Sequence, residues 1–238
     1  MPRERKGVSK PPSQTRDTRR YFVVASEGAD TERIYFQGLQ DLLIEKGISD
    51  TLIKLEFLER KTEKERALSS HKSVLKQLDA YKNAYRLDNR DELWLVIDRD
   101  KQNNPVKNIA DIAQNCQQKG YFLALSNPNF EFWLLLHLKD LTEYSKTELD
   151  NLHYKKAGES KSCLEKELST LLGGYNKSKY DISKILPFID KAILQAKDLD
   201  TNLEERWIED RLGTRVYLLV ERIISIELND EAIIHLNN

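Results

Sequence analysis

The sequence predicts an α/β protein with a parallel sheet of about four strands flanked by helices, followed by an all-helical C-terminal appendage. Two observations support this prediction. Short, unbroken apolar runs alternate with amphipathic helical stretches over residues 20–126, a pattern that is typical of strands buried on both faces of a parallel sheet. Beyond about residue 140 no strand pattern is found, and the apolar residues recur at helical spacing.

The first strand is expected over residues 21–25, and it runs into an acidic turn. Gly28 permits a sharp change of direction there, and Glu27 and Glu32 lie on either side of it. A helix follows with its apolar residues on one face, and Gly47 closes that helix. The first unit is therefore a strand, an acidic turn and a helix.

The central strand is expected over residues 92–98, where five apolar residues run without a break before the chain turns acidic at Asp98 and Asp100. Ligands of open parallel sheets bind beyond the carboxyl ends of the strands. Residues i and i+2 of an extended chain face the same way, so the two carboxylates can point into one pocket. The other elements of this half are a strand at 52–58, a polar helix at 63–86, a helix at 106–118 and a strand at 121–125.

After the last strand, residues 132–137 are apolar on every side and predict a buried helix. Further helices are expected at 158–172, 181–198 and 214–227. Pro187 fits the second of these only if it lies near the first turn. The expected organisation is a flexible basic arm at 1–18, an α/β domain at 19–139 and a helical C-terminal subdomain at 140–238.

Composition excludes several classes of protein. The two cysteines, Cys116 and Cys163, stand far apart without disulfide or zinc spacing, which is typical of a reducing, cytoplasmic compartment. No apolar run approaches about 18 residues, so no membrane-spanning helix is expected, and the basic start lacks the apolar core of a signal peptide. A net charge of −1 gives no global sign of a nucleic-acid binder. The basic arm itself suits either a solvated tail or contact with phosphates.

Acidic residues follow three separate strand ends: Glu27 and Glu32, then Asp98 and Asp100, then Glu131. If the strands are parallel, all three turns lie on one edge of the sheet. Carboxylates crowded together raise each other's pKa unless a cation lies between them. Mg²⁺ and Mn²⁺ take oxygen ligands, and such an ion can hold a phosphodiester and activate water. The sequence therefore predicts a divalent-metal site at this edge.

Each of these acidic residues also has a structural interpretation. Asp98 and Asp100 can form a solvated turn, since acidic residues are common where a strand exits. Glu32 lies in the first turn of a helix, where a carboxylate favours the positive end of the helix dipole. Glu131 can hydrogen-bond the turn at Asn127.

Four further candidates lie outside the acidic turns. His137 is on an apolar helix, where a satisfied core histidine is more usual than a ligand. Lys177 and Lys179 can contact a substrate phosphate or remain solvated at the surface. Arg215 can bind substrate or pair with an acidic residue.

The turn at Glu27-Gly28 and the later Asp98-Arg99-Asp100 resemble the Toprim pattern. Together with the blocks 26–36 (SEGADTERIYF) and 126–137 (SNPNFEFWLLLH), they resemble the RloB-like family in order and spacing. The likeness covers about residues 20–225, including Tyr175-Asn176-Lys177 and Thr214-Arg215-Val216.

This resemblance implies a Toprim-type, Mg²⁺- or Mn²⁺-dependent nuclease of bacterial anti-phage defence, usually encoded beside a partner ATPase. By similarity, Glu27 would be a metal ligand or general acid/base, and Asp98 and Asp100 would be metal ligands. Glu32 would match the second acidic residue of the overcoming-lysogenization-defect nucleases. The substrate would be RNA, possibly tRNA, or DNA, and an oligomer is possible.

Two other functions remain open from the sequence. In one, the chain is a non-catalytic Toprim-like subunit that docks on an ATPase through the helical appendage. In the other, Asp98 is the nucleophile and Asp100 the acid/base of a haloacid-dehalogenase-type phosphatase. Lys101 and Gln102 in place of a small residue, and the late position of the strand, are unfavourable to the phosphatase.

Overall fold

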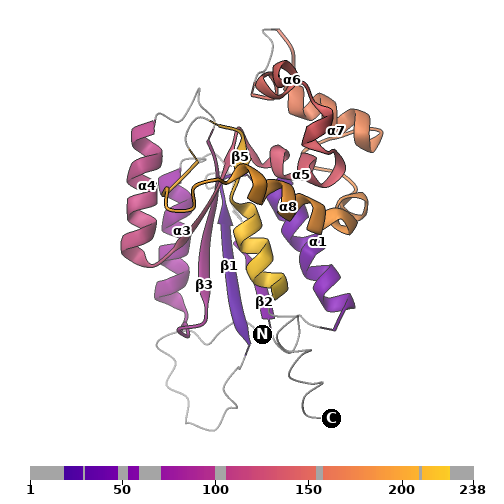
Figure 1. The fold of residues 1–238 in the computed structure, drawn as a ribbon. Coiled ribbons are helices and arrows are strands. Elements are labelled where there is room, and N and C mark those ends of the chain that lie inside the picture. The colour runs from indigo at the N-terminus through magenta and orange to yellow at the C-terminus, as the bar shows by residue number, and fades with distance from the viewer. Residues whose placement is uncertain are drawn as a thin grey trace.

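The computed structural model describes residues 19–28, 30–47, 53–58, 71–99, 106–153, 158–208 and 211–225. Several expectations lie wholly or partly outside these residues, among them the basic arm at 1–18, the first part of the polar helix, the position of Asp100 and the end of the helix expected at 214–227. Figure 1 shows a central sheet with helices on both sides and a cluster of short helices above one edge. The predicted fold class is confirmed.

The sheet has five strands in the order β2-β1-β3-β4-β5. Neighbours from β2 to β4 are parallel, and only β5 runs antiparallel, against the end of β4. The strands are β1 (Arg20–Ser26), β2 (Ile53–Phe57), β3 (Glu92–Asp98), β4 (Phe122–Asn127) and β5 (Gly213–Thr214). In register, Ser26 pairs with Val96 and Asp98 pairs with Ser126. The carboxyl ends of β1, β3 and β4 therefore meet at one edge of the sheet.

The described helices are α1 (Thr31–Glu45), α3 (His71–Ala84), α4 (Val106–Lys119), α5 (Phe130–Leu138), α6 (Lys146–Asn151), α7 (Cys163–Leu172), α8 (Ile189–Leu199) and a last helix at 216–225. Three short 3₁₀ helices are η1 (Leu141–Glu143), η2 (Ile182–Lys184) and η3 (Leu186–Phe188). The helix predicted at 181–198 is thus two 3₁₀ turns followed by α8. Pro187 lies in the first turn of η3, where a missing N–H leaves no hydrogen bond unmade.

Alternating side chains of the strands build two hydrophobic layers. Val24 and Trp94 face α1, α5 and the last helix, whereas Val23 and Leu95 face α3 and α4. In Figure 1, α3 and α4 lie on one side of the sheet and α1 on the other. Because both faces are covered, the two central strands β1 and β3 carry long apolar runs, as the sequence predicted, whereas β2 at the edge of the sheet alternates apolar and charged residues.

The chain returns to the sheet after α8, which corrects the expectation that no strand follows residue 140. Strand β5 has only two residues, too few to show a period-two pattern, and it pairs with the end of β4. The last helix is then held to the sheet by Arg222, which lies over the Trp94 and Phe122 rings and donates to buried Glu92 at 2.8 Å. The C-terminal region therefore contributes to the main sheet as well as to the helical cluster.

Candidate functional site

The ends of β1 and β3 bring acidic residues from distant parts of the chain together. The Glu27 N–H donates to the Val96 carbonyl at 3.1 Å, so the turn after β1 lies beside the last residues of β3. The charge of Glu27 also contributes to raising the pKa of Asp98. Glu27 and Asp98 thus lie at the same edge of the sheet, close enough to interact. Asp100, the second residue of the predicted pair, is outside the described part of the chain.

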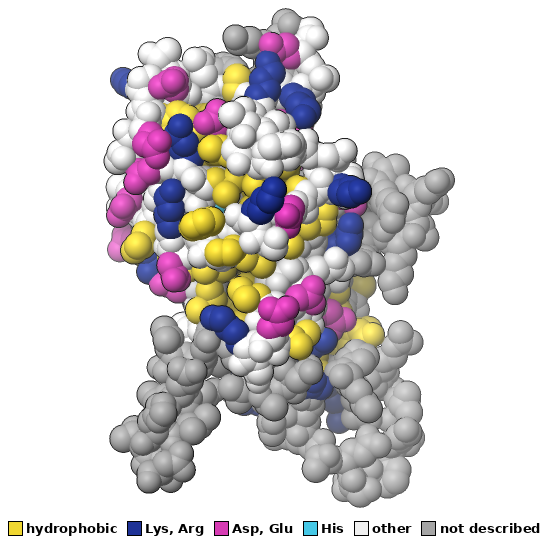
Figure 2. Space-filling view, turned by 90° about the vertical axis from the view of Figure 1, so that its right-hand side faces the viewer, with side chains coloured by type: hydrophobic (Ala, Val, Ile, Leu, Met, Phe, Trp, Pro, Cys, Tyr) yellow, Lys and Arg dark blue, Asp and Glu magenta, His cyan; other side chains and the backbone are white. Residues whose placement is uncertain are grey.

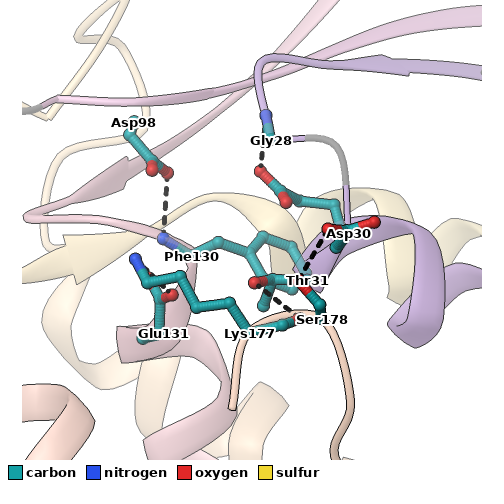
Figure 3. A pocket seen from close by; sticks show the side chains of 9 residues that line it. Gly28, Asp30, Thr31, Asp98, Phe130, Glu131, Lys177 and Ser178 are labelled. Carbon is teal, nitrogen blue, oxygen red and sulfur yellow. Dashed lines mark hydrogen bonds and ion pairs between the residues drawn. The ribbon is translucent and has the colours of Figure 1, made fainter. Parts of the chain in front are cut away.

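A pocket of about 260 Å³ opens at this edge, and we call it the carboxylate pocket (Figure 3). Three segments form it: the turn and first residues of α1, the first residues of α5, and a loop after α7. Asp98 enters from the end of β3. The lining residues are Gly28, Asp30, Thr31, Glu32, Asp98, Phe130, Glu131, Lys177 and Ser178.

Two of the carboxylates accept backbone hydrogen bonds near the starts of helices. Asp98 Oδ1 accepts from the Phe130 N–H at 2.9 Å, at the N-terminus of α5. Glu32 Oε1 accepts from the Gly28 N–H at 3.0 Å, across the turn before α1. Both positions favour negative charge, because the first N–H groups of a helix have no partner within it. A Cβ at Gly28 would lie 1.9 Å from Glu32 Oε2, so only glycine leaves room for this carboxylate.

Glu131 is almost fully buried and is joined to the loop after α7. Its Oε1 lies 2.9 Å from Lys177 Nζ and accepts a longer bond from the Tyr175 hydroxyl at 3.3 Å. Lys177 Nζ also lies 3.7 Å from Glu165 Oε1. The expected bond of Glu131 to the turn at Asn127 does not appear among its described partners. The pairing with Lys177 instead connects α5 to the C-terminal helical cluster.

The electrostatics of the carboxylate pocket are unbalanced. Burial raises the pKa of Asp98 well above its ordinary value, and the charges of Glu32, Glu131 and Glu27 raise it further. Burial also raises the pKa of Glu32 to about 7, with Glu131 adding to the effect. Lys177 acts in the opposite direction on both carboxyl groups. Titratable groups shifted by burial and by neighbouring charge in a cleft are typical of functional sites.

The carboxylates have the chemistry and the charge that a divalent cation requires, but the described ones do not form a complete set of metal ligands. Among the described residues, no group of three or more His, Cys, Asp or Glu side chains is arranged to hold a metal ion. Mg²⁺, however, usually keeps several waters and takes only one or two carboxylates together with substrate phosphates. Glu27 and Asp98 supply that number, and their mutual repulsion is what such an ion would relieve.

His137 does not reach the carboxylate pocket. It is fully buried on α5 and is bonded at both ring nitrogens: Nδ1 lies 2.9 Å from the Trp133 carbonyl, and Nε2 lies 3.2 Å from the Tyr35 hydroxyl. Because a carbonyl can only accept, Nδ1 carries the proton and Nε2 accepts from Tyr35. Burial lowers the pKa of His137 to about 4. The structure thus places this residue in the core, as its structural interpretation anticipated.

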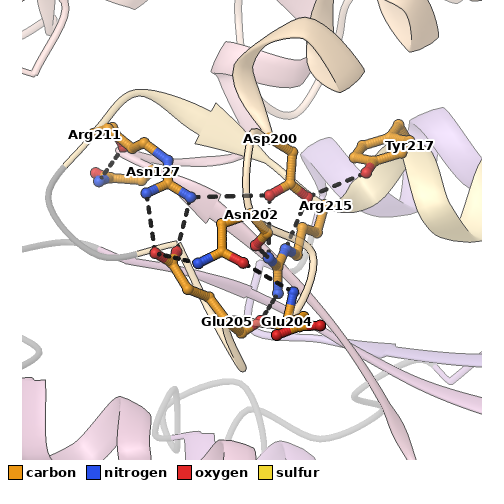
Figure 4. A network of polar contacts seen from close by, with 8 residues as sticks. All are labelled: Asn127, Asp200, Asn202, Glu204, Glu205, Arg211, Arg215 and Tyr217. Atoms are coloured by element: carbon orange, nitrogen blue, oxygen red, sulfur yellow. Dashed lines mark hydrogen bonds and ion pairs between the residues drawn. The ribbon is translucent and has the colours of Figure 1, made fainter.

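The basic candidates are placed in three different environments. Lys177 lines the carboxylate pocket, whereas Lys179 is exposed and is not among the lining residues. Arg215 is buried in a separate network, where Nε and Nη2 lie 2.9 and 3.1 Å from the Asp200 carboxylate (Figure 4). Arg215 also donates to the Asn202 carbonyl at 2.9 Å. It pairs with an acidic residue, which was one of its two expected roles.

Sequence reasoning did not identify Thr31 and Ser178 as residues of this pocket. They are brought together by the loop after α7: the Ser178 hydroxyl donates to Asp30 Oδ2 at 2.8 Å, and the Tyr180 hydroxyl donates to the Thr31 carbonyl at 2.7 Å. These contacts join positions almost 150 residues apart. No local pattern marks them, and only the motif around Lys177 gave a signal for this loop.

A family model for RloB-like proteins matches residues 22–223. The chain belongs to the RloB-like family. The match runs from β1 into the last helix and so includes every described residue of the carboxylate pocket, which confirms the resemblance noted in the sequence. Neither a curated protein nor a solved structure matches this RloB-like chain. No helix in the described ranges is long and apolar enough to cross a bilayer.

Proposed function

We propose that this RloB-like protein is a Mg²⁺- or Mn²⁺-dependent nuclease that hydrolyses phosphodiester bonds of RNA, tRNA included, or of DNA. The observation that carries the proposal is the environment of Asp98. This half-buried carboxylate ends the central strand, accepts a single described hydrogen bond and is surrounded by the charges of Glu32, Glu131 and Glu27. Such an excess of negative charge at a strand end is suited to a divalent cation.

The residues divide into groups that would hold the ion and groups that would move protons. Glu27 and Asp98 would be the ligands, joined by Asp100 if it follows the family resemblance. The bound ion would neutralise phosphate charge and lower the pKa of a coordinated water. Glu32, with a pKa of about 7, is half protonated near neutral pH. It is therefore suited to give or take a proton at the leaving or attacking oxygen.

The biological setting in this proposal rests on family membership. We extend it to bacterial anti-phage defence in concert with a partner ATPase, as the family resemblance implies. The helical cluster formed by α6, α7 and α8 lies toward the upper edge of the sheet in Figure 1, and its helices α7 and α8 pack against α5. The side of the molecule seen in Figure 2 shows hydrophobic side chains among basic and acidic ones. The helical cluster is the region that we propose for docking on the ATPase.

The test is incubation of the purified protein with Mg²⁺ or Mn²⁺ and end-labelled RNA and DNA. We expect cleavage that EDTA abolishes and that Asp98→Ala reduces by about a thousandfold or more, the scale of losing a principal catalytic electrostatic contact. Asp190→Ala, at an exposed position in the first turn of α8, is the matched control and is expected to cut at the wild-type rate. Equal activity of wild type and Asp98→Ala would reject this site.

Two outcomes would favour the other functions. If the isolated protein does not cut but co-purifies with a neighbouring ATPase, the non-catalytic subunit is favoured. If it turns over a chromogenic phosphate monoester instead of a nucleic acid, the phosphatase is favoured.

A further inference from the structure

Lys177 is the single cation among the described residues that line the carboxylate pocket, which also holds four carboxyl groups. Its ammonium lies 2.9 Å from Glu131 Oε1, and its field lowers the pKa of both Asp98 and Glu32. The ammonium therefore offsets part of the negative charge that a divalent cation at Asp98 would also offset.

The loop that carries Lys177 is fastened to α1 independently of this ion pair. Ser178 and Tyr180 donate hydrogen bonds to Asp30 and to the Thr31 carbonyl, as described above. Beyond them, Ile182 of η2 packs on Gly38 so closely that a Cβ there would lie 2.7 Å from Ile182 Cγ1. The backbone of the loop is thus held at the pocket by contacts that do not use the lysine side chain.

The Lys177 side chain is not confined to one partner, since its Nζ also lies 3.7 Å from Glu165 Oε1. It is 50% exposed, whereas its partner Glu131 is only 3% exposed. An ammonium in this position can leave Glu131 for water by rotating its flexible four-carbon stem, with no movement of the loop. The geometry therefore combines a fixed loop with a cation that can enter or leave the carboxylate pocket.

We propose that Lys177 is an internal competitor of the divalent cation. Its ammonium partly neutralises the carboxylate pocket until metal and substrate bind. This inference rests on the metal site of the proposed function and adds its regulation. A divalent ion near Asp98 repels the ammonium, and a substrate phosphate attracts it. The substrate would therefore draw Lys177 away from Glu131 and strengthen metal binding, and by reciprocity the metal would strengthen substrate binding.

The test is calorimetric titration of Mn²⁺ into the purified full-length protein without substrate, at pH 7.5 and low salt. Lys177→Met removes the charge and keeps most of the length of the unbranched side chain, and we expect it to bind Mn²⁺ about tenfold more tightly or better, since like charges a few ångströms apart repel. Lys177→Arg keeps the charge and is expected to bind as wild type does. Thermal unfolding in EDTA checks that both variants are folded.

Lys197→Met is the matched control. Lys197 is 43% exposed and paired with Glu221. The substitution therefore removes a similar ion pair and one positive charge, but outside the carboxylate pocket. Its Mn²⁺ affinity is expected to equal that of wild type. Unchanged or weaker binding by Lys177→Met, or equal tightening by Lys197→Met, would overturn the competitor role.

The two proposals fail in different ways. If Mn²⁺ binding is lost in Asp98→Asn but is not tightened in Lys177→Met, the metal site stands and the competitor role is rejected. If Mn²⁺ binding is absent, or does not depend on Asp98, the metal site of the proposed function is rejected together with its regulation.

Discussion

Two carboxylates at the carboxyl edge of the sheet, the half-buried Asp98 and the buried Asp200, have opposite environments. Asp200 accepts from Arg215 at 2.9 and 3.1 Å and from the Tyr217 hydroxyl at 3.1 Å (Figure 4). Asp98 accepts from one backbone N–H, and the nearest charges that act on it are mostly negative (Figure 3). Among the described residues, the carboxylate of Asp200 is therefore matched by an opposite charge, and that of Asp98 is not.

The difference between Asp98 and Asp200 distinguishes a charge that stabilises the fold from one that does not. A buried charge with a well-placed opposite charge is fixed, and its loss harms folding. A charge held among like charges weakens the fold, and functional sites are where such an arrangement is often found. Arg215, a candidate substrate-binding residue from the sequence, belongs to the matched network of Asp200. Lys177 belongs to the unmatched pocket of Asp98, where it lies partly exposed to solvent.

The largest expected effect is at the matched carboxylate. Asp200→Asn leaves the buried Arg215 guanidinium without its anionic partner, and we expect the free energy of unfolding to fall by about 3–5 kcal/mol. Urea unfolding followed by circular dichroism measures it. A loss below about 1 kcal/mol would mean that the network in Figure 4 does not hold the chain after α8 to the sheet.

The next effect is a pH dependence that arises from Glu32. Its pKa is about 7 in the folded protein against an ordinary 4.5, so its contribution to stability is complete below about pH 4.5 and is lost as the pH rises to 7. At about 1.4 kcal/mol per unit, the loss is on the order of 3 kcal/mol. Urea unfolding at several pH values is expected to show wild type losing this much relative to Glu32→Gln.

Comparison with Glu32→Gln is needed because the titration of His137 changes the stability with pH in the opposite direction. Its pKa is lowered from 6.5 to about 4, so its contribution is complete above pH 6.5 and is lost as the pH falls toward 4. The two effects oppose each other in wild type, and the difference between wild type and variant isolates Glu32. A difference that does not change between pH 4.5 and 7 would show that Glu32 is not perturbed.

A smaller effect is expected at Gly28. In Gly28→Ala the new Cβ displaces the Glu32 carboxylate and breaks its bond to the residue 28 N–H, at a cost of about 1–3 kcal/mol. The same substitution in a Glu32→Ala background has no carboxylate to displace and should cost much less. Equal costs in the two backgrounds, measured as a double-mutant cycle, would contradict this packing.

The smallest effect has the opposite sign. Asp98→Asn removes charge from the carboxylate pocket and keeps an oxygen for the Phe130 N–H, so we expect a gain of about 1 kcal/mol at pH 7.5. Asp98→Asn and Asp200→Asn therefore form a matched pair with changes of opposite direction. If Asp98→Asn destabilises the protein as Asp200→Asn does, the contrast between the two regions is lost.

The sequence by itself determined four of the five strands, their order along the chain and the acidic residues at their ends. Unbroken apolar runs predict strands covered on both faces, and parallel strands end at one edge, so Glu27 and Asp98 could be expected together. The motifs around them also indicated the family. These features depend on neighbours in the chain, which a sequence displays directly.

The tertiary structure decided which charges are paired. Lys177 reaches Glu131 because a distant loop is fastened to α1, Arg215 finds Asp200 through the turn after α8, and His137 turns into the core. The two-residue β5 was likewise beyond any periodic pattern. Pairing depends on contacts between residues far apart in the sequence, and the same residue types therefore give an unmatched pocket at one place and a closed network at another.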